Sequence, residues 1–308
     1  AGDVTADQTT DAGIATPIEF GATGLSSSDP IKHSNKGAMG SLIIEPEGAT
    51  WTEDAKSRAQ ATVSANGGTF REFVMMFQND INLRWGGSIG ATTSTGNGVA
   101  LPNTAQAEDA EDSGQKAVNY RTEPLWKRMG FDPDQPLTGK PEPGEPLDPR
   151  TPTRDFDFTD VLSNSKIGGL DPETPVFTAA AGQAVRVRLL QPGGHSRNNV
   201  FMLHGHIWEE EPYAKDSVIL DSNPLSEWKG SQYGVGPGSH FDFLLKHGAG
   251  GAFAISGDYL YRTFSSMQFD GGIWGIFRVR PAYTPAPPPG CSCPPGQVCP
   301  DVVCPQVN

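Results

Sequence analysis

Two histidines separated by one glycine stand at the end of an apolar, alternating run, and they are the side chains best suited to chemistry in this chain. His204 and His206 follow the run at 198–203 and precede three glutamates at 209–211. A strand that ended in His-x-His would place both imidazoles on one face, because side chains alternate with period two. Neutral imidazole is a frequent transition-metal ligand. The pair could hold one metal ion, serve two ions, or only hydrogen-bond the backbone.

The acidic residues near this pair are compatible with a metal ion as substrate. Carboxylates suit hard divalent ions such as Mn²⁺, although the glutamates at 209–211 could equally form a solvated acidic turn before Pro212. The net charge of −13 favours cations at the surface and argues against nucleic acid or an anionic membrane as a partner. No apolar run reaches the ~18 residues of a membrane span.

The composition predicts an all-β fold. Of the 308 residues, 37 are Gly and 27 are Pro, and only 19% are charged, which is typical of short strands joined by many turns. We expect strands within residues 41–45, 69–80, 184–190, 198–204, 240–245, 257–262 and 275–279, and a short helix at 126–129. Arg186 and Arg188 alternate with apolar neighbours, so we expect both to face solvent. A Greek-key β-sandwich fits this pattern best.

All four cysteines lie in the last 18 residues, a Pro-rich tail, and the body has none. Clustered cysteines of this kind indicate disulfides and a secreted or extracytoplasmic protein; a metal cluster in the tail is the alternative. The disulfide candidates are Cys291, Cys293, Cys299 and Cys304.

Two segments share one design. Residues 37–44 and 272–279 both read Gly-x-x-Gly followed by an apolar strand, which indicates an internal repeat. The repeat resembles the closing part of a cupredoxin domain in multicopper oxidases and nitrite reductases, where the pattern is His-x-x-x-Gly-Met-x-Gly. The resemblance places His33 at the type 1 copper histidine and Ala38 at its axial methionine. In the second copy, Gln268 and Ile273 take these two places.

The central stretch resembles the copper motif His-Pro-x-His-Leu-His-Gly-His of the same family. On this resemblance His204 keeps a type 3 copper ligand, and His206 keeps the trailing histidine, which is usually not a ligand. Asn199 replaces the type 1 histidine, and Met202 replaces the type 2 histidine. Residues 257–264 resemble the strand that should carry Tyr-His-Cys-His, and its three ligand positions hold Arg262, Thr263 and Phe264.

The resemblance covers most of residues 15–283, and the chain resembles the large bacterial multicopper oxidases of the manganese-oxidising type. It implies that residues 1–50 are the closing part of one cupredoxin-like domain, followed by a linker at 51–68. A second cupredoxin-like domain with long loop insertions follows at 69–283, and then the tail at 284–308. A closing hairpin without the rest of its domain would expose sheet edges. We therefore expect another chain or domain to supply the missing strands.

The chain does not carry a complete copper site of its own. A blue copper site needs a cysteine thiolate, and the trinuclear site of the family takes more histidines than the six present here. The resemblance thus implies a secreted multicopper-oxidase-like fragment or subunit, with copper as cofactor and His204, His206 and His33 as candidate ligands of sites shared with another domain. The alternative is a non-catalytic cupredoxin-like interaction module of an extracellular assembly.

Overall fold

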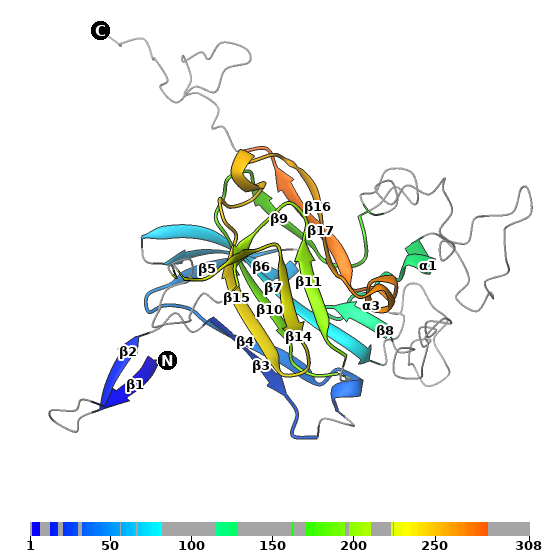
Figure 1. Ribbon diagram of the computed structural model, residues 1–308, viewed down its shortest axis with the longest axis horizontal. Helices are drawn as coiled ribbons and strands as arrows, with labels where there is room; N and C mark the ends of the chain where they lie inside the picture. Colours follow the sequence, from blue (N-terminus) through cyan, green and yellow to red (C-terminus); the bar gives the residue numbers. More distant parts are fainter. Residues whose placement is uncertain are drawn as a thin grey trace, which may run out of the picture.

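The chain folds as two β-sheets packed face to face, with a hairpin against the outer side of one sheet (Figure 1). The computed structural model describes residues 2–6, 13–17, 21–29, 33–55, 57–65, 67–81, 115–128, 162, 171–194, 197–210, 223 and 225–282. None of the helices in these ranges is long and apolar enough to cross a membrane. The predicted all-β Greek-key sandwich is confirmed, because successive strands between β9 and β16 pass back and forth between the two sheets.

The first sheet has the order β15-β10-β7-β6-β5, with β8 paired to the far end of β7. Its strands are β5 (Thr50–Asp54), β6 (Ser57–Ala65), β7 (Gly68–Ile81), β8 (Gln115–Val118), β10 (Val185–Gln191) and β15 (Ser239–Leu244). β10 runs parallel to β7 and antiparallel to β15. Residues 51–68, which were predicted to be a linker, therefore contain β5 and β6, and the linker prediction is corrected by their pairing with β7.

The second sheet has the order β14-β11-β16-β17-β9. Its strands are β9 (Val176–Ala180), β11 (Asn199–Leu203), β14 (Ser231–Val235), β16 (Gly257–Thr263) and β17 (Trp274–Arg280). The remaining elements are β1 (Gly2–Ala6), β2 (Gly13–Pro17), β3 (Gly21–Ser26), β4 (Met39–Ile44), β12 (Trp208–Glu209), β13 (Trp228–Lys229), α1 (Leu125–Arg128), α3 (Ser266–Asp270), η1 (Ser34–Lys36) and η2 (Gly251–Phe253). The short helix predicted near 126–129 is α1.

Alternating apolar side chains of the two sheets form the core between them. Phe73 of β7 contacts Phe177 of β9 and Phe277 of β17, with ring centroids 5.0 and 5.3 Å apart. Phe201 of β11 packs on Trp208, which stacks on Phe243 at 4.4 Å. Such rings bury large apolar areas and account for much of the driving force for closing the sandwich.

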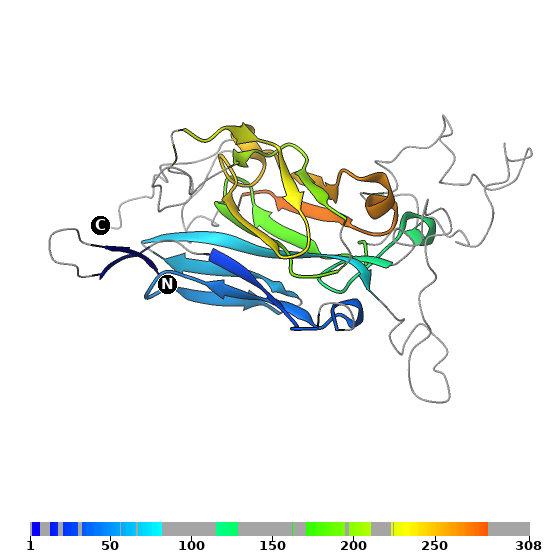
Figure 2. The ribbon, with the colours of Figure 1, turned by 60° about the horizontal axis from the view of Figure 1, so that its bottom comes forward.

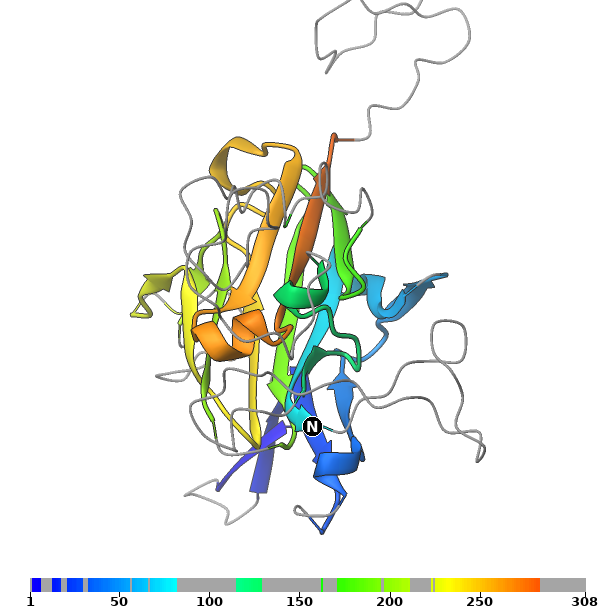
Figure 3. The same cartoon turned by 90° about the vertical axis from the view of Figure 1, so that its right-hand side faces the viewer.

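A smaller apolar cluster closes one end of the sandwich, where α1 and α3 lie side by side (Figures 1 and 3). It joins Leu125 of α1 to Phe269 of α3 and to the buried ring of Trp274. The indole N–H of Trp274 donates to the carbonyl of Glu123 at 2.7 Å. The second copy of the Gly-x-x-Gly repeat is therefore part of the packed end of the fold.

The hairpin β3–β4 forms a third layer on the outer side of the first sheet. β3 contacts β10 and β15, and Figure 2 shows the blue hairpin on the far side of cyan β7 from orange β17. Both carboxylate oxygens of Asp242 on β15 accept the backbone N–H of Ala22, at 3.0 and 3.1 Å. Gly21 makes this approach possible, since a Cβ there would lie 2.3 Å from Asp242.

A buried ion cluster joins the hairpin to the sheet. The guanidinium of Arg188, with no exposed surface, binds Glu72 at 3.0 Å, Asp242 at 2.9 Å and Glu45 at 2.5 Å. Arg186 is also buried and lies over the ring of Phe70 at 4.2 Å. The expectation that both arginines face solvent is wrong, because β3–β4 and the segment after it cover that face of the sheet.

We expect Arg188→Met to lower the free energy of unfolding by about 3–5 kcal/mol, because three buried carboxylates would lose their common cation. Urea denaturation measures the loss. Arg58→Met is the matched control, since the Arg58 side chain is 90% exposed and should matter by less than ~0.5 kcal/mol. Equal effects of the two substitutions would contradict the structural role of Arg188.

Candidate functional site

The His-Gly-His segment is a turn at the end of β11. The strand ends at Leu203, and the N–H of His206 returns to the carbonyl of Leu203 at 3.3 Å. Gly205 between the histidines has φ +73°, a left-handed conformation that favours glycine. His204 is exposed, whereas His206 is only 3% exposed. The prediction that both rings share one strand face is therefore wrong, because the strand has already turned.

Both ring nitrogens of His206 are engaged by the backbone. Nε2 accepts the N–H of Gly250 at 3.0 Å, and Nδ1 lies 2.9 Å from the carbonyl oxygen of His204. Since the Gly250 N–H can only donate, Nε2 carries the lone pair and Nδ1 carries the proton. The ring also makes an edge contact with Tyr259 at 4.7 Å. His206 thus ties the turn to the loop that precedes η2.

Burial lowers the pKa of His206 below its ordinary value, although the bond to the His204 carbonyl opposes the shift. The imidazole is neutral at pH 7, the form that could bind a metal. In this arrangement, however, ligation through Nε2 would require loss of the Gly250 hydrogen bond, and Nδ1 would have to give up its proton.

His204 is the accessible member of the pair. Although the ring is largely accessible, its partial burial and then the positive charge of Arg262 lower its pKa, so it is neutral at pH 7 and has the protonation state of a ligand. Arg262 occupies one of the three positions where the resemblance expected copper ligands. A cation bound at His204 would share its surroundings with this guanidinium, which opposes binding.

Two of the other positions where the resemblance placed copper ligands hold buried side chains, Asn199 and Thr263. Asn199 is fully buried and donates from Nδ2 to Oε1 of Gln191 at 2.9 Å. Thr263 is buried, and Phe264 is 66% exposed. Within the described ranges no group of three or more His, Cys, Asp or Glu side chains could hold a metal ion. The side chains at these positions therefore do not fit a copper site.

His33 lies on the β3–β4 connection, just before η1. Its Nδ1 is 2.7 Å from the hydroxyl of Ser27, and its side chain is exposed. It therefore belongs to the hairpin layer, whereas His204 and His206 follow a strand of the second sheet. The four cysteines proposed to form disulfides lie outside the described residues, as does His195.

Glu209 differs from the solvated acid considered for the run at 209–211. It is 4% exposed, and its carboxylate accepts the backbone N–H of Asn223 at 3.2 Å. Glu210 lies 3.5 Å from Lys229. These two carboxylates already have partners, and Glu211 lies outside the described residues.

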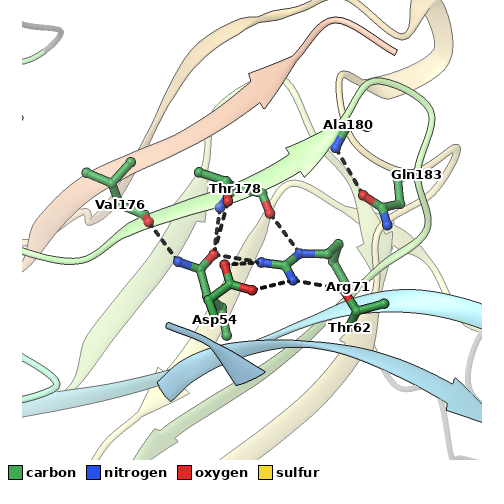
Figure 4. A network of polar contacts seen from close by, with 8 residues as sticks. Asp54, Thr62, Arg71, Val176, Thr178, Ala180 and Gln183 are labelled. Atoms are coloured by element: carbon green, nitrogen blue, oxygen red, sulfur yellow. Dashed lines mark hydrogen bonds and ion pairs between the residues drawn. The ribbon is translucent and has the colours of Figure 1, made fainter. Parts of the chain in front are cut away.

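A buried arginine that the sequence did not mark links the two sheets (Figure 4). Arg71 donates to both carboxylate oxygens of Asp54, to the hydroxyl of Thr62, to Oε1 of Gln60 and to the carbonyl of Thr178, at 2.8–3.0 Å. Thr178 belongs to β9 of the opposite sheet. An open hollow of about 780 Å³ lies beside this network. All five guanidinium N–H donors are already used, so Arg71 is a poor ligand-binding group.

No family model matches this sequence, and no curated protein matches it. Similar solved structures include a blue copper oxidase from Nitrosomonas europaea, with 14% identity and a TM-score of 0.41 over 89% of this chain and 63% of that one. A laccase from Botrytis aclada has 17% identity and a TM-score of 0.41 over 90% of this chain and 38% of that one. A copper nitrite reductase from Nitrosomonas europaea has 14% identity and the same TM-score, over 90% and 73% of the two chains.

The chain thus spans less than two thirds of the blue copper oxidase and of the laccase. At such identities and TM-scores no role of a residue is carried across from these copper proteins. The manganese-oxidising type of activity stays a prediction.

We expect His206→Ala to lower the free energy of unfolding by about 2–4 kcal/mol, because it removes two buried hydrogen bonds and leaves a cavity. His204→Ala is the matched control and should cost less than ~0.5 kcal/mol. Chemical denaturation of both variants provides the comparison. A larger loss in His204→Ala would show that the wrong histidine has been given the structural role.

The same residue predicts a pH dependence. The unfolded chain takes up a proton on His206 as the pH falls below about 6.5, while the folded state, with its lowered pKa, resists it. Stability contributed by the neutral ring is therefore present above this pH and lost below it. As the pH is lowered from 8 to 5, the midpoint temperature of thermal unfolding should fall more steeply for the parent chain than for His206→Ala.

Proposed function

We propose that this chain is a non-catalytic interaction module that joins a cupredoxin-like sandwich to further strands of a larger assembly. The observation that carries the proposal is the hairpin β3–β4. Within the described residues its two strands pair only with each other, and it exposes Leu25 at 50% and Leu42 at 48%. An open strand edge beside exposed leucines is a site for strand addition.

The register of the hairpin places these leucines on the same side. Leu25 pairs with Gly40, and Leu42 pairs with Thr23, two residues along each strand. Their side chains therefore lie on one face, opposite the face where Ala22 and Gly24 approach the first sheet. A further sheet packed on that outer face would bury both leucines and complete a second sandwich. The partner we propose is the chain or domain that supplies those strands.

The firm attachment of the hairpin supports this function. Asp242 holds the N–H of Ala22, and Arg188 holds Glu45 just after β4. A partner that added strands to β3 or β4 would thereby gain a fixed orientation relative to the sandwich.

Copper-dependent oxidation through a site shared with another domain is the second candidate. The exposed, neutral imidazole of His204 favours it, while the side chains at the remaining motif positions do not fit. A metal ion or small reductant would be the substrate, and a secreted location would suit the cysteine tail. Each of these features stays a prediction.

Hydrogen exchange tests the module. In the chain alone, the amides of β3 and β4 that face away from their own ladder should exchange much faster than those of β7 and β10. In material isolated with its native partner, those outer amides should be protected at least tenfold. Equal exchange in both preparations would exclude strand addition at this hairpin, while Leu25→Glu with Leu42→Glu should abolish any protection seen.

Metal analysis by mass spectrometry distinguishes the second candidate. The chain alone should bind copper at well below one ion per chain. The oxidase subunit would be favoured over the interaction module by one outcome. The native assembly would hold one or more copper ions per chain, and this copper would be lost in His204→Ala but kept in His247→Ala.

A further inference from the structure

A pocket lies between the hairpin layer and the outer face of the first sheet, away from the His-Gly-His turn. Its volume is about 500 Å³, within the range of small-molecule sites. The walls come from β4, β5, β6 and β7 and the loop after β4, and they are mostly apolar. Ile43, Trp51, Ala61, Val63 and Val74 supply this surface.

Two carboxyl groups, Glu45 and Glu72, line the same pocket. Each side chain is only 9% exposed, and both contact the guanidinium of Arg188. Burial and then the neighbouring Glu45 raise the pKa of Glu72 to about 8, although Arg188 opposes the shift. The pKa of Glu45 is lowered: burial acts against this shift, while Glu72, Arg188 and Arg186 favour it. At pH 7 Glu72 is therefore the protonated carboxyl of the two.

The acidic and basic groups behind the pocket are unequal in number. Glu45, Glu72 and Asp242 surround the guanidinium of Arg188, and Arg186 lies 3.9 Å from Glu45. Three carboxyl groups therefore meet two guanidinium groups. His240 also acts on Asp242 through its charge, and Glu53 pairs with Arg58 at the pocket rim at 3.6 Å.

We propose that this pocket binds a small hydrophobic amine, whose ammonium group meets Glu45 and Glu72 while its apolar part fills the cavity. Oε2 of Glu45 is buried and has no hydrogen-bond partner among the described residues, so an ammonium would supply the donor that it lacks. The carboxyl proton of Glu72 leaves to solvent as the ammonium arrives, and no bond between heavy atoms changes.

The pocket mouth suits the same ligand class. Trp51 lines it and is 62% exposed, so its indole face can meet an aromatic ring or the charge of an ammonium. A neutral ligand of equal size would gain only the apolar contact. An anion would meet three acidic side chains against one rim arginine, Arg58.

Calorimetry on the full chain with 2-phenylethylamine tests the proposal, and 2-phenylethanol is the neutral probe of matched shape. The amine should bind at least tenfold more tightly than the alcohol. It should release up to one proton at pH 7, measured in buffers of different ionisation enthalpy. Its affinity should rise by up to about tenfold per pH unit from pH 6 to 8 and level off above.

Glu72→Gln mimics the neutral carboxyl, so it should fold normally while losing tenfold or more in amine affinity and all of the proton release. Glu47→Gln, an exposed glutamate outside the pocket, should bind like the parent chain. Equal binding of amine and alcohol, absence of proton release, or equal loss in both variants would each overturn the proposal. Failure of the parent chain to bind the amine would also overturn it. The comparison of amine with alcohol and the measurement of proton release use the parent chain alone, so they do not depend on the folding of a variant.

Discussion

The position of Arg188 constrains more of this molecule than any other single contact. Its guanidinium is fully buried between a sheet and a hairpin, where carboxyl groups of β7, of β15 and of the residue after β4 surround it. Glu72 and Asp242 belong to the sheet, and the hairpin side supplies the third group, Glu45. This contact, together with the N–H of Ala22 on Asp242, ties the third layer of the fold to the sheet.

Arg71 links the two sheets to each other, as Arg188 links the first sheet to the hairpin. One arginine joins β5 and β6 to β9 across the open side of the sandwich, and the other joins β10 and β15 to the segment around β4. Between them lies the outer surface of β6 and β7, which forms the floor of the apolar pocket. The Arg188 cluster borders this pocket through Glu45 and Glu72, while most of the lining is apolar.

Strand positions were largely predictable from the sequence, because alternation at 184–190 and 240–245 and the apolar run at 69–80 are local signals. The roles of Arg186 and Arg188 were not. An alternating strand shows which residues share a face, but whether that face meets water depends on a hairpin more than a hundred residues earlier in the chain. The same limit applies to β5 and β6, whose small polar residues read as a linker and become strands only through pairing with β7. For the His-Gly-His segment, the residue types marked a region of interest, but the sequence did not predict how the two rings are oriented. The left-handed conformation of Gly205 turns them away from a common face.

The fold by itself accounts for two residues of the His-Gly-His turn. Gly205 has to be glycine, because a Cβ would meet the ring of Tyr259 at 3.0 Å in a backbone already at positive φ. His206 has to offer one acceptor and one donor to two backbone groups while fitting against Tyr259 and Phe277. Neither demand involves a metal, and together they require the last two residues of the motif. The fold places no such constraint on the side chain of His204, because its ring is exposed. Its backbone N–H donates to the carbonyl of Leu260, a bond that any residue except proline could make. Among the three residues, therefore, His204 is the one whose identity the fold does not explain, and a function of this turn in a larger assembly would have to act through it.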